Sequence, residues 1–304
     1  MALQSTFCVM HSNHGGRDKD DAMPGRLILC GTPIGNLGDL SQRALQTLRD
    51  ADVIACEDTR RTRKLLTHFG VAPRELVVYN DINERRQGDR LASRIQKGAD
   101  LVLVSDAGMP GLSDPGYRLV RICVERGLPV DVVPGPSAVV TALAVSGLPP
   151  GRFVFEGFLP RKQGDRRRRI EEMATEQRTL VLFESPHRLA AAIGDLLEVL
   201  GDRSAALARE LTKLHEEVRR GSLSELLKGL RLDPARGEVV IVLEGASPAS
   251  RDLSAVELAR RARALMDSGM ERRMALAAVA KEAGVARRRV FDALLERADE
   301  AAIE

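Results

Sequence analysis

The 304-residue sequence contains no tryptophan, and aromatic residues make up only 3% of it. Its cores must therefore be built from leucine, valine, isoleucine and alanine, within an apolar fraction of 44%. No apolar run approaches the roughly 18 residues of a membrane-spanning helix, so no membrane span is expected. The length and apolar content suit two domains of ordinary size and a small appendage.

Cysteine is also scarce, and the four thiols include no CxxC pair. Cys30, Cys56 and Cys123 lie in apolar segments and are expected to be buried and reduced, which predicts a cytoplasmic protein. No His, Cys or Asp cluster has metal-ligand spacing, so no metal is expected. Residues 1–25 lack the basic start and continuous apolar stretch of a signal peptide, and we expect a disordered leader.

From residue 26 onward, short apolar runs alternate with segments whose apolar residues recur at i, i+3 and i+4. Leu101–Val104 is typical of the runs, which read as buried strands. Strands that alternate with helices predict an α/β domain with a mostly parallel sheet, which we place at residues 26–148.

The turn-rich stretch Gly147–Arg152 interrupts this pattern and is the expected hinge. Strand and helix signals resume in residues 149–247 and predict a second α/β domain with a mixed sheet. Residues 252–304 are rich in Ala, Arg, Glu and Leu and carry no strand signal. We expect a helical tail domain there, with helix–turn–helix spacing and Gly284 in the turn.

Two loops that follow predicted strands are rich in glycine and acidic, and contain no Lys or Arg: Gly31–Ser41 and Ser105–Gly116. Neither contains GxGxxG or GxxxxGK[ST], and a phosphate site normally offers basic residues. Loops at the ends of parallel strands face one cleft. Their chemistry suits a cationic or neutral ligand, and S-adenosylmethionine fits because it carries a sulfonium and an ammonium but no phosphate.

Helix capping is the alternative role for these loops. Asp114 precedes a proline and, taken singly, is better explained as an N-cap than as a ligand contact. Ser41 or Asp39 can cap the first helix in the same way, and Ser137 can cap the helix after a third turn, with binding there equally open. The second loop as a whole, however, has about twice the roughly 2–6 residues of an ordinary strand-to-helix turn.

Two basic clusters stand apart from the acidic loops. In Glu57–Lys64, a helix capped by Thr59 would carry four cations in its first turns, where they oppose the helix dipole. Arg161–Arg169 has six cations in nine residues, and Gly164 gives it mobility. Against a merely solvated face, we favour phosphate contact, with the second cluster ordering on binding. The predicted RNA-binding residues are Arg60, Arg61, Arg63, Lys64, Arg161, Lys162, Arg166 and Arg167.

Seven segments between Leu27 and Leu243 occur in a distinctive order: GTPIGNLGDLS, ADVIACEDTRRTRKLL, SDAGMPGLSDPG, VPGPSAVVTALAVSGLP, FVFEGFLPRK, LVLFESPHRL and ARELTKLHEEVRRGSL. Together they resemble the tetrapyrrole methylases, a class of S-adenosylmethionine-dependent methyltransferases. Within that class, the sequence is most similar to enzymes that methylate the ribose 2′-hydroxyl of a cytidine in the decoding centre of 16S rRNA.

The resemblance implies two α/β lobes of the tetrapyrrole-methylase type, unlike a Rossmann fold, with the donor in a cleft between them. It also implies a homodimer whose partner is 16S rRNA or the 30S subunit. After the third strand, where relatives typically carry a histidine, this chain has Asn80 and Asp81. The implied donor-binding residues are Pro33, Ser105, Asp106, Ala107, Gly108, Met109, Pro110, Ser113, Asp114, Ser137, Ala138, Glu184 and Ser185.

Methylation of a 2′-hydroxyl needs in-line approach of the oxygen and loss of its proton. A carboxylate or a neutral lysine can take the proton, and a cation can stabilise the developing alkoxide. His187 is a weaker candidate, because a histidine in a first helical turn more often packs or caps. The catalytic candidates are Glu57, Lys64, Glu184 and Lys213, with Asp58 and Glu210 also considered.

Two other functions remain open at this point. A tetrapyrrole C-methyltransferase would share the donor loops, although an enclosed pocket for a tetrapyrrole has no need of basic clusters along an open surface. A non-enzymatic nucleic-acid-binding protein would act through the C-terminal helices around Arg287–Arg289.

Overall fold

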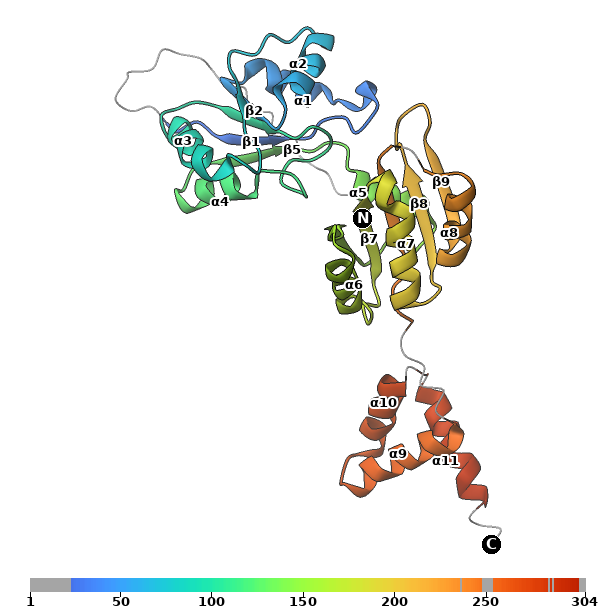
Figure 1. The fold of residues 1–304 in the computed structure, drawn as a ribbon. Coiled ribbons are helices and arrows are strands. Elements are labelled where there is room, and N and C mark those ends of the chain that lie inside the picture. Colours follow the sequence, from blue (N-terminus) through green and yellow to red (C-terminus); the bar gives the residue numbers. More distant parts are fainter. Residues whose placement is uncertain (1–22, 236, 248–253, 284, 286, 301–304) are drawn as a thin grey trace, which may run out of the picture. The chain divides into compact units, whose positions relative to one another are not determined.

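The computed structural model describes residues 23–235, 237–247, 254–283, 285 and 287–300. The expected leader lies almost entirely outside this part, as does Gly284 of the expected turn. The chain forms two compact units (Figure 1). Unit 1 holds the described residues up to Thr141 together with Leu211–Leu214, and unit 2 holds the remainder. The division falls inside a helix that ends just before the expected hinge.

Unit 1 contains a five-stranded sheet in which every pair of strands is parallel, in the order β3-β2-β4-β1-β5. The residues of β2 and β4 are buried throughout, as expected of strands covered on both faces. The parallel α/β domain is therefore confirmed. The strands are β1 (Leu27–Cys30), β2 (Val53–Cys56), β3 (Leu76–Val78), β4 (Leu101–Val104) and β5 (Val130–Val133).

Two separate cores lie on the two faces of this sheet, because alternate strand residues point to opposite sides. Leu101 and Leu103 pack with apolar residues of α3 and α4, whereas Val102 and Val104 pack with those of α1 and α2. The pairs of helices are visible on either side of the sheet (Figure 1). The helices are η1 (Leu37–Asp39), α1 (Gln42–Asp50), α2 (Thr59–His68), α3 (Glu84–Gln96), α4 (Tyr117–Glu125) and α5 (Ala138–Ser146).

Unit 2 contains a mixed five-stranded sheet in the order β6-β7-β10-β8-β9, in which only β6 and β7 are a parallel pair. Leucine, isoleucine and alanine fill its core, as the lack of aromatic residues predicts. The elements are β6 (Phe153–Phe158), α6 (Gln163–Glu172), β7 (Thr179–Glu184), α7 (Pro186–Leu200), β8 (Ser204–Arg209), β9 (Glu217–Ser222), α8 (Leu223–Leu232) and β10 (Val239–Leu243).

The last described residues form three helices with a core of their own. Leu258, Val279 and Val290, one from each helix, are fully buried in it. The α/β fold with two lobes and a C-terminal helical segment is therefore confirmed. The helices are α9 (Ala255–Asp267), α10 (Arg272–Ala283) and α11 (Arg287–Glu300).

Three local expectations are wrong. Asp58 caps α2 in place of Thr59, because its carboxylate accepts a hydrogen bond from the amide of Arg60 at 2.8 Å. Asp114 does not cap α4, because the helix begins only at Tyr117, after Gly116 at φ +148°. Gly164 lies within the helix α6 and does not mark a mobile segment.

Other local expectations are confirmed. Ser41 caps α1 by accepting a hydrogen bond from the amide of Ala44 at 3.1 Å. Cys30, Cys56 and Cys123 are buried free thiols. Among the described residues, no helix is both long enough and apolar enough to cross a bilayer.

Candidate functional site

The carboxyl ends of β1 and β4 meet where the chain changes the direction in which it builds the sheet of unit 1. From β1 the chain runs to β2 and β3 at one edge, and from β4 it continues to β5 at the other. Ligands of open α/β sheets bind outside the carboxyl ends of the strands at such a switch point. The two acidic loops, Gly31–Ser41 and Ser105–Gly116, both leave the sheet there.

Hydrogen bonds join these two loops. Thr32 and Gly108 exchange backbone hydrogen bonds of 2.9 and 3.1 Å. The hydroxyl of Thr32 donates to the carbonyl of Ser105 at 3.2 Å, and the hydroxyl of Ser105 donates to the carbonyl of Gly108 at 3.2 Å. Both hydroxyl residues are buried. The loops therefore form one connected backbone surface at the switch point.

The loop between β5 and α5, residues 134–137, is the third loop at this edge of the sheet, and it approaches the first loop so closely that no side chain fits between the two backbones. A Cβ atom on Gly31 would lie 2.6 Å from Cα of Gly135 and 2.8 Å from Sδ of Met109. Gly108, at φ +84°, faces the carbonyl of Pro136 at the end of the same third loop. The structure thus brings together the predicted donor-binding residues of unit 1 from three strand ends. Ser137 lies directly before the first residue of α5, Ala138.

Acidic groups gather around the loop that follows β4. The amide of Asp106 donates to Oε1 of Glu57 at 3.0 Å, across the neighbouring strand ends of β4 and β2. Burial raises the pKa of the Glu57 and Asp106 carboxyls. Burial and then the charge of Glu57 raise the pKa of Asp114 to about 7. A cation placed here would favour the ionised carboxylates, which is the electrostatics expected for a positively charged ligand.

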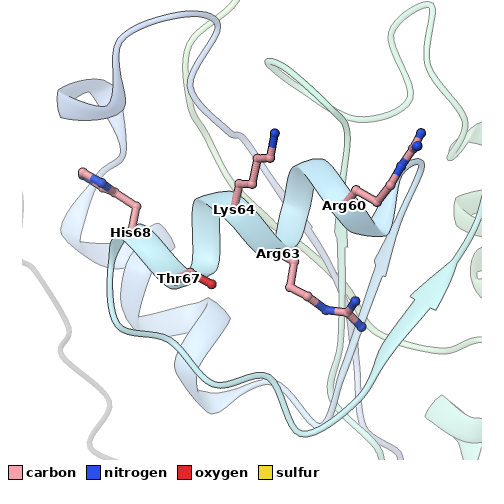
Figure 2. Close-up of a pocket in the computed structure, with 5 residues that line it drawn as sticks. All are labelled: Arg60, Arg63, Lys64, Thr67 and His68. Carbon is pink, nitrogen blue, oxygen red and sulfur yellow. The ribbon is translucent and has the colours of Figure 1, made fainter.

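Basic side chains line a shallow hollow on α2 (Figure 2). Arg60, Lys64 and His68 point to one side of the helix, and Arg63 and Thr67 to the other. Arg60 is bonded to Asp58 at 2.8 Å, which lowers the pKa of that carboxyl to about 2. Within the described residues, no carboxylate pairs with Arg63 or Lys64. Their positive charges are therefore available to an anion.

Arg61, the remaining predicted RNA contact on α2, joins this basic helix to the acidic loop. Its Nη1 lies 3.3 Å from Oδ2 of Asp106. The other oxygen of Asp106, Oδ1, is buried and has no hydrogen-bond partner among the described residues.

Arg166, which was predicted to contact RNA as part of the second basic cluster, is instead buried in an ion pair. Its side chain is only 6% exposed and lies 2.6 Å from Oδ2 of Asp195, which is itself 4% exposed. Burial opposes ionisation of Asp195, yet hydrogen bonds from Gln163, Arg167 and Arg166 lower its pKa overall. A buried pair of this kind serves the packing of α6 on α7 and does not reach a phosphate.

The neighbours of Arg166 are also largely paired. Arg167 bonds to Asp195 at 2.9 Å and to Glu198 at 2.5 Å, and the next two arginines along α6 have acidic partners as well. Arg161 and Lys162, which precede the helix, are exposed and have no acidic partner among the described residues. The charge that remains available in this cluster is therefore concentrated at those two residues.

The catalytic candidates divide between the units. Glu57, Lys64 and Lys213 belong to unit 1, where Lys213 lies so close to Gly35 that a Cβ on that glycine would collide with its Cγ. Glu184 belongs to unit 2 and is buried at the end of β7, next to Ser185. Its Oε1 accepts from the amide of Ser185 at 2.7 Å.

Of the two further candidates, Asp58 is occupied as the cap of α2, and Glu210 accepts a hydrogen bond from the amide of Glu238 at 3.1 Å. His187 is exposed in the first turn of α7. The described residues contain no group of three or more His, Cys, Asp or Glu side chains arranged to hold a metal ion.

Sequence reasoning missed several residues of this surface. Thr32 was not singled out, although it comes two residues after a predicted strand in a Gly-Thr-Pro turn. Gly31 and Gly135 were not recognised as a point of backbone contact, because the two residues are far apart in the sequence and no local pattern pairs them. Thr67 and His68 both lie about one helical turn beyond Lys64, the last of the cations in the predicted cluster.

Comparison with known proteins identifies relatives over most of the chain. A profile of the tetrapyrrole (corrin/porphyrin) methylases matches residues 26–227. The ribosomal RNA small subunit methyltransferase I of Thermotoga maritima is 47% identical over 221 residues, which cover 73% of this chain and 99% of that protein. The protein of the same name from Escherichia coli O157:H7 is 43% identical over 280 residues, which cover 91% of this chain and 97% of that protein.

A solved structure shows the same fold. Uroporphyrin-III C-methyl transferase from Thermus thermophilus, complexed with S-adenyl homocysteine, superposes with a TM-score of 0.50 at 22% identity, covering 72% of this chain and 97% of that one. The profile match and the identities to the curated relatives, each over most of the chain, decide the family. The chain therefore belongs to the tetrapyrrole methylases, a family of S-adenosylmethionine-dependent methyltransferases, and is similar over most of its length to proteins named ribosomal RNA small subunit methyltransferase I.

Proposed function

We propose that this protein methylates the ribose 2′-hydroxyl of a cytidine in the decoding region of 16S rRNA, as a homodimer in the cytoplasm. The observation that carries the proposal is the contact of Arg61 with Asp106, which joins a loop suited to a cation to a helix suited to a polyanion. The names of relatives that are 43–47% identical support an RNA of the small ribosomal subunit as the substrate. A tetrapyrrole would leave the exposed cations of α2 without a role.

The three loops of unit 1 fit S-adenosylmethionine. Close packing at Gly31 and Gly135 leaves backbone groups, with no side chains between them, at the strand ends. The unpartnered Oδ1 of Asp106 offers a negative charge to an ammonium or a sulfonium. When bound, S-adenosylmethionine supplies the electrophilic methyl group. Residues of the loop from Ser105 to Asp114, together with Pro33, Ser137 and Ala138, would hold it, and Glu184 and Ser185 of unit 2 would contribute on the adenine side.

Glu57 is our choice for the group that accepts the hydroxyl proton. Burial raises its pKa, so the carboxylate is a stronger base than an exposed glutamate. The amide of Asp106 fixes Oε1 of Glu57, which leaves Oε2 for the substrate. Lys64 and Lys213 would supply positive charge toward the ribose oxygen and its flanking phosphates. Arg60, Arg63, Arg161 and Lys162 would bind the RNA backbone.

Transfer of tritiated methyl groups from S-adenosylmethionine to small-subunit particles that lack the modification tests this proposal. We expect label in 16S rRNA, mapped as a 2′-O-methyl cytidine, with wild-type protein. Glu57→Gln should lower kcat by about 10²–10⁴-fold, the range typical of a lost general base. Asp50→Asn, an exposed carboxylate on α1, serves as the control and should keep full activity. Label that appears instead in a uroporphyrinogen-like compound would refute the RNA substrate.

A further inference from the structure

The three C-terminal helices carry an exposed basic and aromatic surface that the proposed methyl transfer does not use. The guanidinium carbon of Arg272, at the start of α10, lies 5.3 Å from the centre of the Phe291 ring on α11. Arg287 and Arg288 precede Phe291 by four and three residues, so they lie on the same side of α11 as the ring. All three arginines are exposed, and the phenylalanine is 38% exposed.

This positive charge is poorly compensated. Nε of Arg288 lies 3.8 Å from Oδ2 of Asp292, and the arginine side chain is 91% exposed. Within the described residues, no carboxylate pairs with Arg272 or Arg287. Cations in the first turn of α11 also oppose its dipole and so destabilise the helix slightly. Stability of α11 therefore does not account for Arg287 and Arg288.

The comparison with relatives indicates that these helices are an addition to a complete enzyme. The 221 residues that this chain shares with the Thermotoga maritima relative cover 99% of that protein. The two α/β lobes, residues 26–247, are of about the same length. The alignment with the Escherichia coli relative extends to 280 residues. A protein with the same name thus consists almost entirely of the two lobes, and the added helices are expected to serve something other than the chemical step.

We propose that Arg272, Arg287, Arg288 and Phe291 form a second RNA-contact surface, which binds a segment of the substrate RNA away from the methylated nucleotide. The guanidinium groups pair with phosphates, and the exposed face of the phenylalanine stacks on an unpaired base. Arg272 beside the ring adds a cation to that stacking position. The identity of the RNA rests on the proposed function, whereas the binding chemistry rests on this surface alone.

The test compares three full-length proteins: wild type, Arg287→Ala/Arg288→Ala, and the control Arg260→Ala/Arg263→Ala, which removes the same charge from α9 of the same segment. Binding to 16S rRNA is measured by fluorescence anisotropy over a range of salt concentrations. We expect Arg287→Ala/Arg288→Ala to weaken binding about 10-fold and to reduce the salt slope by about one to two. KM for RNA should rise while kcat and the affinity for S-adenosylmethionine stay unchanged. Phe291→Leu keeps an apolar side chain and should weaken binding to single-stranded RNA with little change in the salt slope.

The outcomes separate this inference from the proposed function. Affinity within twofold of wild type for Arg287→Ala/Arg288→Ala, or an equal loss in the control, would overturn the second surface even if methyl transfer to rRNA is observed. RNA binding that depends on these arginines, in a protein that places no methyl group on rRNA, would instead overturn the proposed reaction and leave the surface standing.

Discussion

Nη1 of Arg61, on the basic helix α2, lies 3.3 Å from Oδ2 of Asp106, in the acidic loop after β4. This pair links the element proposed to contact RNA with the element proposed to hold the methyl donor. The positive charge of Arg61 also offsets the repulsion between Asp106 and the nearby carboxylates of Asp58 and Glu57. Removal of either partner is therefore expected to alter both binding functions.

Asp106→Asn is expected to weaken S-adenosylmethionine binding about 10-fold, because it removes the negative charge next to the cationic ligand. Arg61→Gln should weaken RNA binding and change donor binding less. A double-mutant cycle, measured by calorimetry with the donor, should give a coupling free energy below about 1 kcal/mol, since the arginine side chain is 65% exposed. A larger coupling would mean that the pair is desolvated in the bound state.

The raised pKa of Asp114 predicts a pH dependence of stability. Its pKa is about 7 in the folded protein and near 4 in an unfolded chain, so the folded state binds more protons between these values. Stability from this group is therefore present below about pH 4 and is lost as the pH rises through 7. Asp114→Asn removes the dependence, and the melting temperature of wild type relative to this variant should fall by about 3 °C from pH 5 to pH 8. A difference that stays constant, or changes in the opposite direction, would contradict the assigned burial.

Gly31→Ala tests the backbone contact between the donor loops. The added methyl group would lie 2.6 Å from Cα of Gly135, and backbone on both sides cannot give way cheaply. We expect a loss of about 1–3 kcal/mol in the free energy of unfolding and a marked loss of donor binding. Gly194→Ala is the control, because a Cβ there meets nothing within 4 Å and the residue lies inside α7. That variant should be as stable as wild type or slightly more so.

Asp195→Ala tests the structural role of Arg166. The substitution leaves a buried guanidinium without its carboxylate, so the free energy of unfolding should fall by about 3–5 kcal/mol in urea denaturation. Arg161→Ala/Lys162→Ala should leave stability unchanged within about 0.5 kcal/mol, because both residues are exposed. RNA affinity should weaken in Arg161→Ala/Lys162→Ala and stay unchanged in Asp195→Ala. An Arg166→Met protein that folds but loses RNA binding would reinstate Arg166 as an RNA contact.

The order of strands and helices along the chain was predictable from the sequence. Strands that are buried on both faces, such as Leu101–Val104, appear in the sequence as continuous apolar runs. Prediction from the local pattern failed where the outcome depends on residues distant in sequence. Arg166 is buried because Asp195, on the following helix, neutralises it, and no spacing within the arginine run reveals that partner. Asp114 did not become a cap because the chain first passes through left-handed conformations at Ser113 and Gly116.

Unit 1 is not a continuous piece of chain. Leu211–Leu214 belongs to it, and the hydroxyl of Thr212 accepts a hydrogen bond from the amide of Asn36 at 3.1 Å. During synthesis the first sheet can form early, but the loop that follows its opening strand must wait for this segment. By then β6, β7 and β8 have been made, whereas β9 and β10 have not. The loop after β1 can therefore reach its final form only after β6, β7 and β8 have been synthesised, although its own strand is the first of the chain.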